Sequence, residues 1–458
     1  MNRKKFEQYK KMLRFFATML LVTFLVLIFI KFWINAYNEG IVLPFHYKGY
    51  WMVSAFYVFF NVLFLYIYGG TSYGYLTKNN VIFSQILSLL CANVLIYLET
   101  VLLSAKFVNV LPMLKITVIQ AVLTIIYSYV VDKLFRKLFP PHRITVLYQE
   151  YDPNDMLRKV KTRGDRYLIK NIVNVNQDWD QLRKIIDSSE AIMVYDVHSE
   201  LRNRIVKYCY EKSIRLYVTP KISDILVRSS ENIHLFDTPL LLFRNNGLTF
   251  EERFIKRAMD VFVSLLVILV TSPIMIVISI AIKMYDGGPV FFKQKRCTLD
   301  GKVFEIHKFR SMIVDAEKEG VSVPASEKDP RITPVGNIIR MTRLDELPQA
   351  FDILMGNMSL VGPRPERIEH VEKYSEFVPE FAYRLKMKGG LTGYAQIYGK
   401  YNTGAYDKLK LDLMYIQNHS ILMDIKLILM TIKIMFMKES TEGFDEKQIS
   451  DIQAREKE

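Results

Sequence analysis

Cysteine is scarce in this chain of 458 residues, which contains three, at Cys91, Cys209 and Cys297. They lie far apart, form no C-x-x-C pair and leave an odd one over, so neither a disulfide framework nor a cysteine zinc site is indicated. Acidic residues are outnumbered, because 61 Lys and Arg against 47 Asp and Glu give a net charge of +14. Hydrophobic residues make up 50% of the sequence, which excludes a disordered, coiled-coil or collagen-like chain.

Charge is nearly absent from four long apolar stretches in the first third of the chain. Each stretch is near the ~20 residues that a helix needs to cross ~30 Å of hydrocarbon. The first has the basic flank of a signal peptide, but it is long, lacks a small-residue cleavage site and is followed by three more, so we expect a retained anchor. We predict a four-helix transmembrane bundle in residues 1–140, with its helices near 15–36, 51–67, 81–105 and 108–131.

The distribution of Lys and Arg predicts the orientation of this bundle. Basic residues are concentrated before the first stretch and after the fourth, whereas the loop between the first two stretches carries only Lys48. The positive-inside rule therefore places both ends of the bundle, and the chain that follows, in the cytoplasm. Glu99 lies inside the third stretch. An ionisable residue there is a functional hypothesis, but no partner is evident, so we favour a structural or interfacial position.

From about residue 143 to 245, short β-branched runs alternate with charged helical segments. This alternation predicts a small cytoplasmic α/β domain with a parallel sheet over 141–247. No G-x-G-x-x-G follows the first strand, so a regulatory or oligomerising module is favoured over a nucleotide site. The predicted strands are 144–148, 191–197 and 214–218, the predicted helices are 178–187 and 200–212, and a polar linker follows at Asn245, Asn246 and Gly247.

A fifth apolar stretch, 261–282, contains no charged residue and carries Ser272-Pro273 at its centre. A proline there removes a backbone donor and kinks or breaks a helix. Both flanks are basic, so a crossing helix would violate the positive-inside rule on one side. We therefore favour a re-entrant membrane helix over about 261–284, with both ends in the cytoplasm. The alternative is a fifth, kinked span, which would place the remaining chain outside the cell.

Three basic groups between residues 283 and 438 suit phosphate binding. Alternating apolar and polar residues in 306–309 predict an extended segment from which Lys308 and Arg310 project on one face. Arginine forks make bidentate contacts to phosphate, although solvated surface charge or contact with anionic lipid is the usual role of any single basic residue. The other two groups are Arg331, Arg340 and Arg343, and then Arg364 and Arg367.

An acidic pair, Asp345-Glu346, lies between these basic groups. The apolar spacing around it is helical, and Pro348 is tolerated only in a first turn, so we expect the pair at a helix amino terminus, where free N–H groups favour carboxylates and phosphates. Adjacent carboxylates can share a divalent cation, or one can attack phosphorus while the other handles a proton. The alternative is an acidic N-cap without catalysis. The flanking arginines and the rigid turn at 361–365 favour a catalytic role for the pair over a capping role.

Together these residues resemble the monotopic phosphoglycosyl transferases, the bacterial polyprenol-phosphate sugar-1-phosphate transferases that initiate capsule, exopolysaccharide and O-antigen repeat units. The matches follow the family's order over about 250–438. The amino-terminal spans and a truncated Rossmann-like domain resemble the extension of the large members. The matching motifs are Lys256-Arg257-x-x-Asp260, the Ser272-Pro273 break, Gly288-Pro289-Val290-Phe291-Phe292-Lys293-Gln294, Lys308-Phe309-Arg310-Ser311-Met312, Asp329-Pro330-Arg331-Ile332-Thr333, Leu344-Asp345-Glu346-Leu347-Pro348-Gln349, Met358-Ser359-Leu360-Val361-Gly362-Pro363-Arg364-Pro365 and Gly390-Leu391-Thr392-Gly393.

The resemblance implies a Mg²⁺-dependent transfer of a sugar 1-phosphate from a UDP-sugar to undecaprenyl phosphate, with release of UMP and a covalent phosphosugar on an aspartate. It implies that Asp345 is the nucleophile and a Mg²⁺ ligand. It implies that Glu346 assists Asp345, either as a base or as a further ligand of the Mg²⁺ site. It also implies a mainly α monotopic catalytic domain over 248–458, in a fold that combines membrane α-helices with an α/β domain. The implied phosphate-binding residues are Lys308, Arg310, Arg340 and Arg364.

The same resemblance implies a multi-pass protein of the bacterial cytoplasmic (inner) membrane that contacts membrane lipid. The extension is compatible with a homodimer, although the sequence does not define the oligomeric state, and we expect no nucleic-acid partner. Residues 424–438 fit an in-plane amphipathic helix, with a core helix as the alternative. The chain departs from the family pattern at Thr298 and Gly389, where glycine and proline are usual. Two other classes stay open, a membrane-bound UDP-sugar dehydratase and a non-enzymatic assembly scaffold. The motif Tyr406-x-x-x-Lys410 resembles the pair used by short-chain dehydratases, but the sequence has no Gly-rich cofactor loop, so we treat this match as coincidence.

Overall fold

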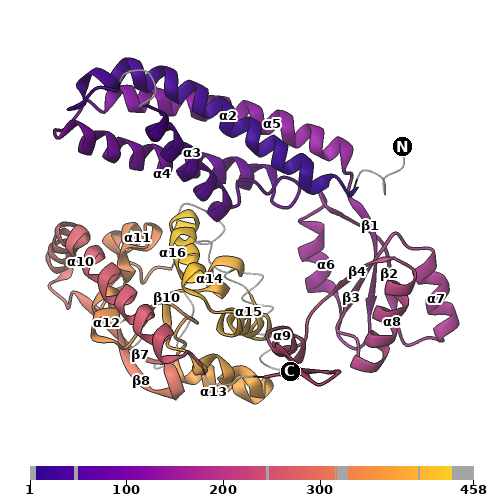
Figure 1. The fold of residues 1–458 in the computed structure, drawn as a ribbon. Coiled ribbons are helices and arrows are strands. Elements are labelled where there is room, and N and C mark those ends of the chain that lie inside the picture. The colour runs from indigo at the N-terminus through magenta and orange to yellow at the C-terminus, as the bar shows by residue number, and fades with distance from the viewer. Residues whose placement is uncertain are drawn as a thin grey trace. The chain divides into compact units, whose positions relative to one another are not determined.

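The computed structural model describes residues 7–45, 50–243, 247–314, 316, 329–400 and 403–435. The chain forms two compact units, Met1–Thr219 and Pro220–Glu458, and each is described by itself. Figure 1 shows the first unit as long helices followed by a sheet with flanking helices, and the second as a mixture of helices and short strands.

Four long apolar helices begin the first unit, as the sequence predicts. Their inward faces share one core, in which Phe29, Tyr57, Ile96 and Ile116 are fully or almost fully buried. The Gln120 side chain donates to the Tyr57 hydroxyl at 2.7 Å and to a backbone carbonyl at 2.9 Å, so this buried amide is satisfied within the helices. The helices are α2 (Lys10–Tyr37), α3 (Tyr50–Tyr68), α4 (Lys78–Ser104) and α5 (Leu111–Leu138). With α10 in the second unit, five helices of the described chain are long and apolar enough to cross a membrane.

A four-stranded parallel sheet follows, in the order β2-β1-β3-β4, and the predicted α/β alternation is confirmed. The sequence missed β2, an edge strand whose polar residues hide its periodicity. Strands β1 and β3 are buried on both faces, which explains their continuous apolar runs. The elements are β1 (His142–Tyr148), α6 (Asn154–Lys161), β2 (Tyr167–Asn174), α7 (Trp179–Asp187), β3 (Ala191–Tyr195), α8 (Ser199–Glu211) and β4 (Arg215–Val218).

The boundary between the two compact units falls earlier than the linker at 245–247 that the sequence indicates. Helix α9 (Ile222–Arg228) belongs to the second unit because Ile222 and Ile225 pack on Phe381, Leu409 and Leu413. The hairpin of β5 (Glu231–Leu235) and β6 (Thr238–Leu242) comes next. Asn245 and Asn246 of the predicted linker lie outside the described residues.

Helix α10 (Phe250–Asp286) contains the fifth apolar stretch and begins well before it. A reciprocal capping box between Thr249 and Glu252 fixes the start, and Gly287 in the left-handed conformation ends the helix. The predicted break at Ser272-Pro273 is not a gap, because one helix runs through Pro273.

The remaining elements of the second unit surround a core that includes Ile306, Ile353, Val361, Tyr415 and Leu427. Strands β7 and β8 form an antiparallel pair, and the short strands β9 and β10 form a parallel pair. The elements are β7 (Phe291–Cys297), β8 (Val303–Phe309), α11 (Pro334–Met341), η3 (Leu344–Glu346), α12 (Gln349–Met355), β9 (Ser359–Val361), α13 (Ile368–Phe377), β10 (Gly390–Thr392), α14 (Tyr394–Tyr398), α15 (Ala405–Gln417) and α16 (Ile421–Met435).

Candidate active site

The acidic pair Asp345-Glu346 lies on η3, a single 3₁₀ turn directly before α12. The sequence places the pair at a helix start. The structure refines this expectation, because Pro348 is the residue that caps α12 and the pair has a turn of its own. Arg343 precedes the turn with φ of 60°, a left-handed backbone conformation that a side chain rarely adopts. The chain therefore bends sharply just before the two carboxylates.

Two cations from distant parts of the chain meet at Glu346. The Lys308 ammonium donates to Glu346 Oε1 at 2.7 Å, and the Arg364 guanidinium donates to the same oxygen at 2.8 Å. Lys308 comes from β8, as the predicted extended segment requires. Arg364 follows Gly362, where a side-chain Cβ would lie 2.2 Å from the carbonyl of Lys388, so only glycine permits this close turn.

The two carboxylates are in electrostatically different states. Burial raises the pKa of the Asp345 carboxyl, and the neighbouring charge of Glu346 raises it further against the opposing effect of Lys308 and Arg340. Burial would also raise the pKa of Glu346, but Lys308 and Arg364 hold it well below its usual range. Glu346 is therefore the permanently charged member of the pair.

Asp345 accepts no hydrogen bond and forms no ion pair with any residue in the described part of the chain, although its side chain is only partly exposed. Arg340, on α11, likewise donates no side-chain hydrogen bond to a described residue, and its charge acts on Asp345. One carboxylate is thus anchored, and the next is available to a ligand.

Arg310, which the sequence groups with Lys308, points elsewhere. Its guanidinium forms a bidentate pair with Asp286 at the end of α10, at 2.6 Å and 2.5 Å, and its Nε donates to the Pro289 carbonyl at 2.7 Å. The side chain is 6% exposed. These contacts tie β8 to α10, and the assignment of Arg310 to phosphate binding stays a prediction.

The Lys256-Arg257-x-x-Asp260 motif fastens α10 to the site. The Lys256 ammonium donates to Asp424 Oδ2 at 2.6 Å and to the Val361 carbonyl at 2.8 Å, and both side chains are buried. Arg257 donates to the last carbonyls of α12, at 2.7 Å each. Asp260 accepts from the Leu360 amide at 2.8 Å and the Ser359 hydroxyl at 3.0 Å. Sequence reasoning recognised this motif without predicting its partners.

A partly buried His307–Asp352 pair was also missed. Asp352 lies on α12 with its side chain fully buried, and it accepts from the His307 ring at 2.7 Å and from the His307 amide at 2.9 Å. His307 directly precedes Lys308 on β8. The pair therefore fixes the strand that delivers Lys308 against the helix that follows the acidic turn. Only the alternating pattern of 306–309 could have indicated that His307 points opposite to Lys308.

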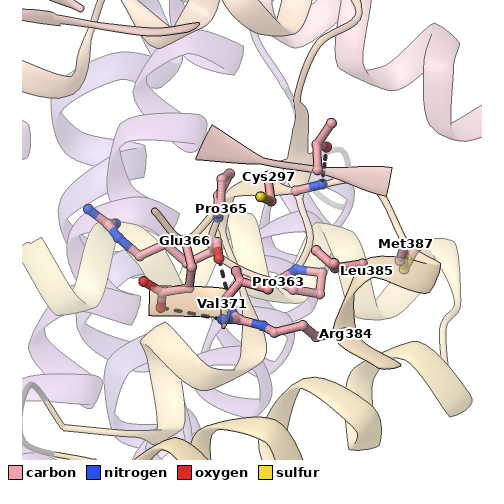
Figure 2. A pocket seen from close by; sticks show the side chains of 11 residues that line it. Cys297, Pro363, Pro365, Glu366, Val371, Arg384, Leu385 and Met387 are labelled. Atoms are coloured by element: carbon pink, nitrogen blue, oxygen red, sulfur yellow. Dashed lines mark hydrogen bonds and ion pairs between the residues drawn. The ribbon is translucent and has the colours of Figure 1, made fainter. Parts of the chain in front are cut away.

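Figure 2 shows Glu366 and Arg384 directed toward one another beside Pro363 and Pro365, and their ion pair measures 3.3 Å. The Arg384 guanidinium also donates to the Arg364 carbonyl at 3.0 Å. The cavity among these residues has a volume of about 10 Å³, enough for one water and too small for a nucleotide sugar. This region therefore supports the loop that carries Arg364.

The two departures from the family pattern contact one another. The Gly389 amide donates to the Thr298 hydroxyl at 3.0 Å, and Thr298 is buried. Proline at 389 would have no amide hydrogen to donate, and glycine at 298 would have no hydroxyl to accept it. The two departures therefore depend on one another, because each residue supplies one partner of the same hydrogen bond. Both positions are distant in sequence from the acidic pair.

The residues present fit a divalent cation such as Mg²⁺ at Asp345. Mg²⁺ is usually bound through one or two carboxylates together with substrate phosphates, rather than by a cage of protein ligands. No cluster of three or more His, Cys, Asp or Glu suited to a metal occurs among the described residues. The carboxylate oxygens of Asp345 have no protein partner in that part of the chain, whereas Glu346 Oε1 is already shared by two cations.

Comparison with known proteins shows the family of the chain. The family model described as "Bacterial sugar transferase" matches residues 251–438. The chain is 33% identical over 271 residues to the UDP-glucose:undecaprenyl-phosphate glucose-1-phosphate transferase of Escherichia coli (strain K12), covering 56% of this chain and 58% of that protein. It is 35% identical over 233 residues to the UDP-N-acetylgalactosamine-undecaprenyl-phosphate N-acetylgalactosaminephosphotransferase of Aeromonas hydrophila, covering 50% and 54%.

A third relative, the exopolysaccharide production protein PSS of Rhizobium leguminosarum bv. phaseoli, is 40% identical over 187 residues, which are 39% of this chain and 93% of that protein. The chain is a sugar transferase by this similarity, with described helices long and apolar enough to associate with a membrane. It belongs to the bacterial sugar transferase family. The chain spans about half the length of the Escherichia coli and Aeromonas relatives that it matches.

Proposed function

We propose that this protein transfers a sugar 1-phosphate from a UDP-sugar to undecaprenyl phosphate, releases UMP, and thereby initiates a capsule, exopolysaccharide or O-antigen repeat unit. The observation that carries the proposal is the asymmetry of the acidic pair: Glu346 is held by Lys308 and Arg364, and Asp345 is left with a raised pKa and no described partner. The names of the Escherichia coli and Aeromonas relatives, which describe transfers to undecaprenyl phosphate, support it.

In the first step, a carboxylate oxygen of Asp345 attacks the phosphorus that bears the sugar. A bond forms between that oxygen and phosphorus, and the bond from phosphorus to the bridging oxygen breaks, so UMP leaves with the bridging oxygen and its electron pair. In the second step, an oxygen of the lipid phosphate attacks the same phosphorus and the Asp345 carboxylate departs. The product carries the sugar on a lipid diphosphate, and the enzyme is regenerated.

The role that we propose for Glu346 is to organise cations. Of the two duties that the sequence left open, base and ligand, the base is disfavoured by its contacts, because a carboxylate held well below its usual pKa is a weak proton acceptor. Its charge holds Lys308 and Arg364 beside the attacking carboxylate, where both can neutralise phosphate oxygens. Arg340 lies free of side-chain hydrogen bonds to described residues and would contact the substrate directly.

We further propose that Mg²⁺ binds at Asp345 together with the substrate phosphates, with Glu346 contributing through its charge. Bound there, the ion would neutralise oxygens of the diphosphate. Repulsion between a carboxylate and a diphosphate makes such neutralisation necessary before attack.

The proposed membrane arrangement is a four-helix transmembrane bundle and a truncated Rossmann-like domain, with the catalytic unit on the cytoplasmic face of the bacterial inner membrane. Helix α16 supports a lipid contact, because its buried residues include Asp424 and Lys433 whereas Leu422 and Ile425 are exposed. Polar groups facing inward and apolar groups facing outward suit an interfacial position. Leu427 packs in the core, so α16 has features of both an in-plane amphipathic helix and a core helix. Residues 436–438 of the predicted helix lie outside the described residues.

A bend in α10 at Ser272-Pro273 would make this helix re-entrant, and its contacts support this proposal. Arg257 binds the carbonyl end of α12, whereas Ile278 packs with Leu344 and Leu347 just before the same helix. A straight helix would separate residues 257 and 278 by ~32 Å at ~1.5 Å per residue. In the structure, however, the partners of residues 257 and 278 lie at the end of α12 and just before its start, and α12 is only one short helix. Both parts of α10 can reach α12 more easily if α10 is bent.

The test measures UMP release by the full-length protein in detergent or nanodiscs, with undecaprenyl phosphate and a panel of UDP-sugars. We expect release with at least one sugar, and loss of that release in Asp345→Asn. The control, Asp300→Asn, alters an acidic residue of the β7–β8 connection and should keep full activity. Conversion of a UDP-sugar to a dehydrated UDP-sugar that needs NAD, without release of UMP, would favour the dehydratase. Neither UMP release nor dehydration with any UDP-sugar would favour the scaffold.

A further inference from the structure

The first compact unit contains a cavity that the proposed reaction does not use. Its volume is about 450 Å³, within the ~300–1,000 Å³ usual for small-ligand sites. It is lined by the start of α2, the loop between α3 and α4, the end of α5 and the residues that begin β1, β2 and β4. The strands thus contribute their amino-terminal ends, the edge opposite to that at which parallel sheets usually bind nucleotides.

Positive charge predominates in the cavity. Its three acidic side chains are each engaged by an arginine: Glu7 by Arg215, Asp132 by Arg136 and Asp165 by Arg163, at 2.7, 2.7 and 2.9 Å. Three further lining cations have no carboxylate partner among the residues that the structure describes. These are Lys11, Arg14 and Arg166.

Two of these cations, Arg14 and Arg166, and also Lys10 lie over the ring of Tyr75. The Arg14 guanidinium lies 4.4 Å and the Arg166 guanidinium 4.7 Å from the centroid of its ring, and the Lys10 ammonium lies at 5.9 Å. Burial would raise the pKa of the Tyr75 hydroxyl, yet these three cations lower it, as expected in a field that favours anions. Like charges gathered on one aromatic ring repel one another unless an anion joins them.

We propose that this cavity is a binding site for a phosphate-bearing anion, held chiefly by Arg14 and Arg166. Guanidinium groups bind phosphate in bidentate geometry, and two of them converge here on one ring. Two sources share this chemistry: the headgroup of an anionic phospholipid, or a soluble diphosphate. The apolar side chains of Phe15 and Phe16 are exposed on α2 directly after Arg14, so an acyl chain could continue from a bound headgroup along the helix.

The experiment uses the full-length protein in detergent. Native mass spectrometry measures binding of phosphatidylglycerol against phosphatidylcholine, and calorimetry measures binding of inorganic pyrophosphate. We compare the wild type with Arg14→Gln/Arg166→Gln. The matched control is Lys184→Gln/Lys207→Gln, which removes the same charge from exposed positions on α7 and α8. Melting temperatures establish that each variant is folded, and Arg166→Gln alone replaces the double variant if that protein melts early.

We expect the wild type to bind one of the two anionic probes, and the double glutamine variant to bind it about tenfold or more weakly, as the loss of charge-assisted contacts to phosphate predicts. The lysine control should match the wild type. Selective retention of phosphatidylglycerol identifies a lipid headgroup, and binding of pyrophosphate identifies a soluble ligand. The proposal is overturned if the wild type binds neither probe, or if the glutamine variants bind as the wild type does. These binding measurements do not depend on the transferase reaction, so they can be interpreted whether or not a variant releases UMP.

Discussion

Lys308 and Glu346 are 38 positions apart in the chain, and their charged atoms are 2.7 Å apart in the structure. The contact joins strand β8 to the acidic turn, and Arg364 completes it from a third segment. Because Glu346 neutralises two cations beside Asp345, it sets the charge around the group that we propose as nucleophile.

Glu346→Gln should reduce UMP release by about a hundredfold or more, the scale typical for loss of one preorganised electrostatic group. The amide keeps the shape but loses the charge that holds Lys308 and Arg364 in place. Rates at saturating UDP-sugar measure the effect. Glu305→Gln, on the same strand as Lys308 but half-exposed, is the control. Equal rates in Glu346→Gln and wild type would contradict the role assigned to this carboxylate.

The pH dependence of the reaction should follow Asp345. A carboxyl with a raised pKa becomes protonated at a higher pH than an ordinary aspartate, so activity should fall as the pH drops through that value. Arg340 lowers the pKa of Asp345, so Arg340→Gln should move the acid limb to higher pH. Profiles of kcat measure the shift. Arg253→Gln, on an exposed face of α10, should leave the limb in place.

Arg310 and Asp286 should behave as one structural unit. If their bidentate pair only ties β8 to α10, then Asp286→Asn and Arg310→Gln lower the melting temperature by similar amounts. The Michaelis constant for UDP-sugar should then change little in either variant. A large increase of that constant in Arg310→Gln alone would instead support the phosphate-binding role that the sequence suggested.

The buried Lys256–Asp424 pair should be costly to break from one side. Lys256→Met leaves Asp424 charged in the core and should lower the free energy of unfolding by about 3–5 kcal/mol. The double variant Lys256→Met/Asp424→Leu should recover part of that loss, because no unpaired charge remains. Denaturant titration in detergent measures both. Arg253→Met, three positions earlier and exposed, should be neutral.

The two ends of α10 should be accessible from the same side of the membrane. Phe250 and Met284 are 72% and 81% exposed near opposite ends of the helix. Single cysteines at these positions, in a variant without Cys91, Cys209 and Cys297, should react alike with an impermeant maleimide applied to inside-out vesicles. Reaction of only one of them would indicate a spanning α10.

The sequence predicted those parts of the structure that depend on local pattern. The apolar runs located α2 to α5, and the β-branched runs located β1, β3 and β4, because each pattern lies within one element. Strand β2 was missed since its edge position leaves Lys170 and Asn171 exposed, which removes the apolar signal. Lys308 was expected in an extended segment, and it lies in β8.

Partners brought together by the tertiary fold could not be predicted. Lys308 lies in β8 and Arg310 directly follows the end of that strand, yet one binds Glu346 and the other binds Asp286. Alternation along a strand fixes the face but not the neighbours that approach it. For the same reason, the partners of Lys256 and of His307 had no local signal. Long-range contacts decide which residues of a recognisable motif face a ligand and which hold the scaffold.

The anchoring of α10 by Lys256, Arg257 and Asp260 has a mechanical consequence. These three side chains bind β9, α12 and α16 at once, so the helix cannot tilt or slide without carrying the acidic turn along. The position of the two carboxylates therefore follows the position of the amino-terminal part of α10, before Pro273. Inserting one residue into α10 after Asp260 would rotate the following part of the helix by ~100°, so its exposed apolar residues would no longer face the direction that the anchored segment sets.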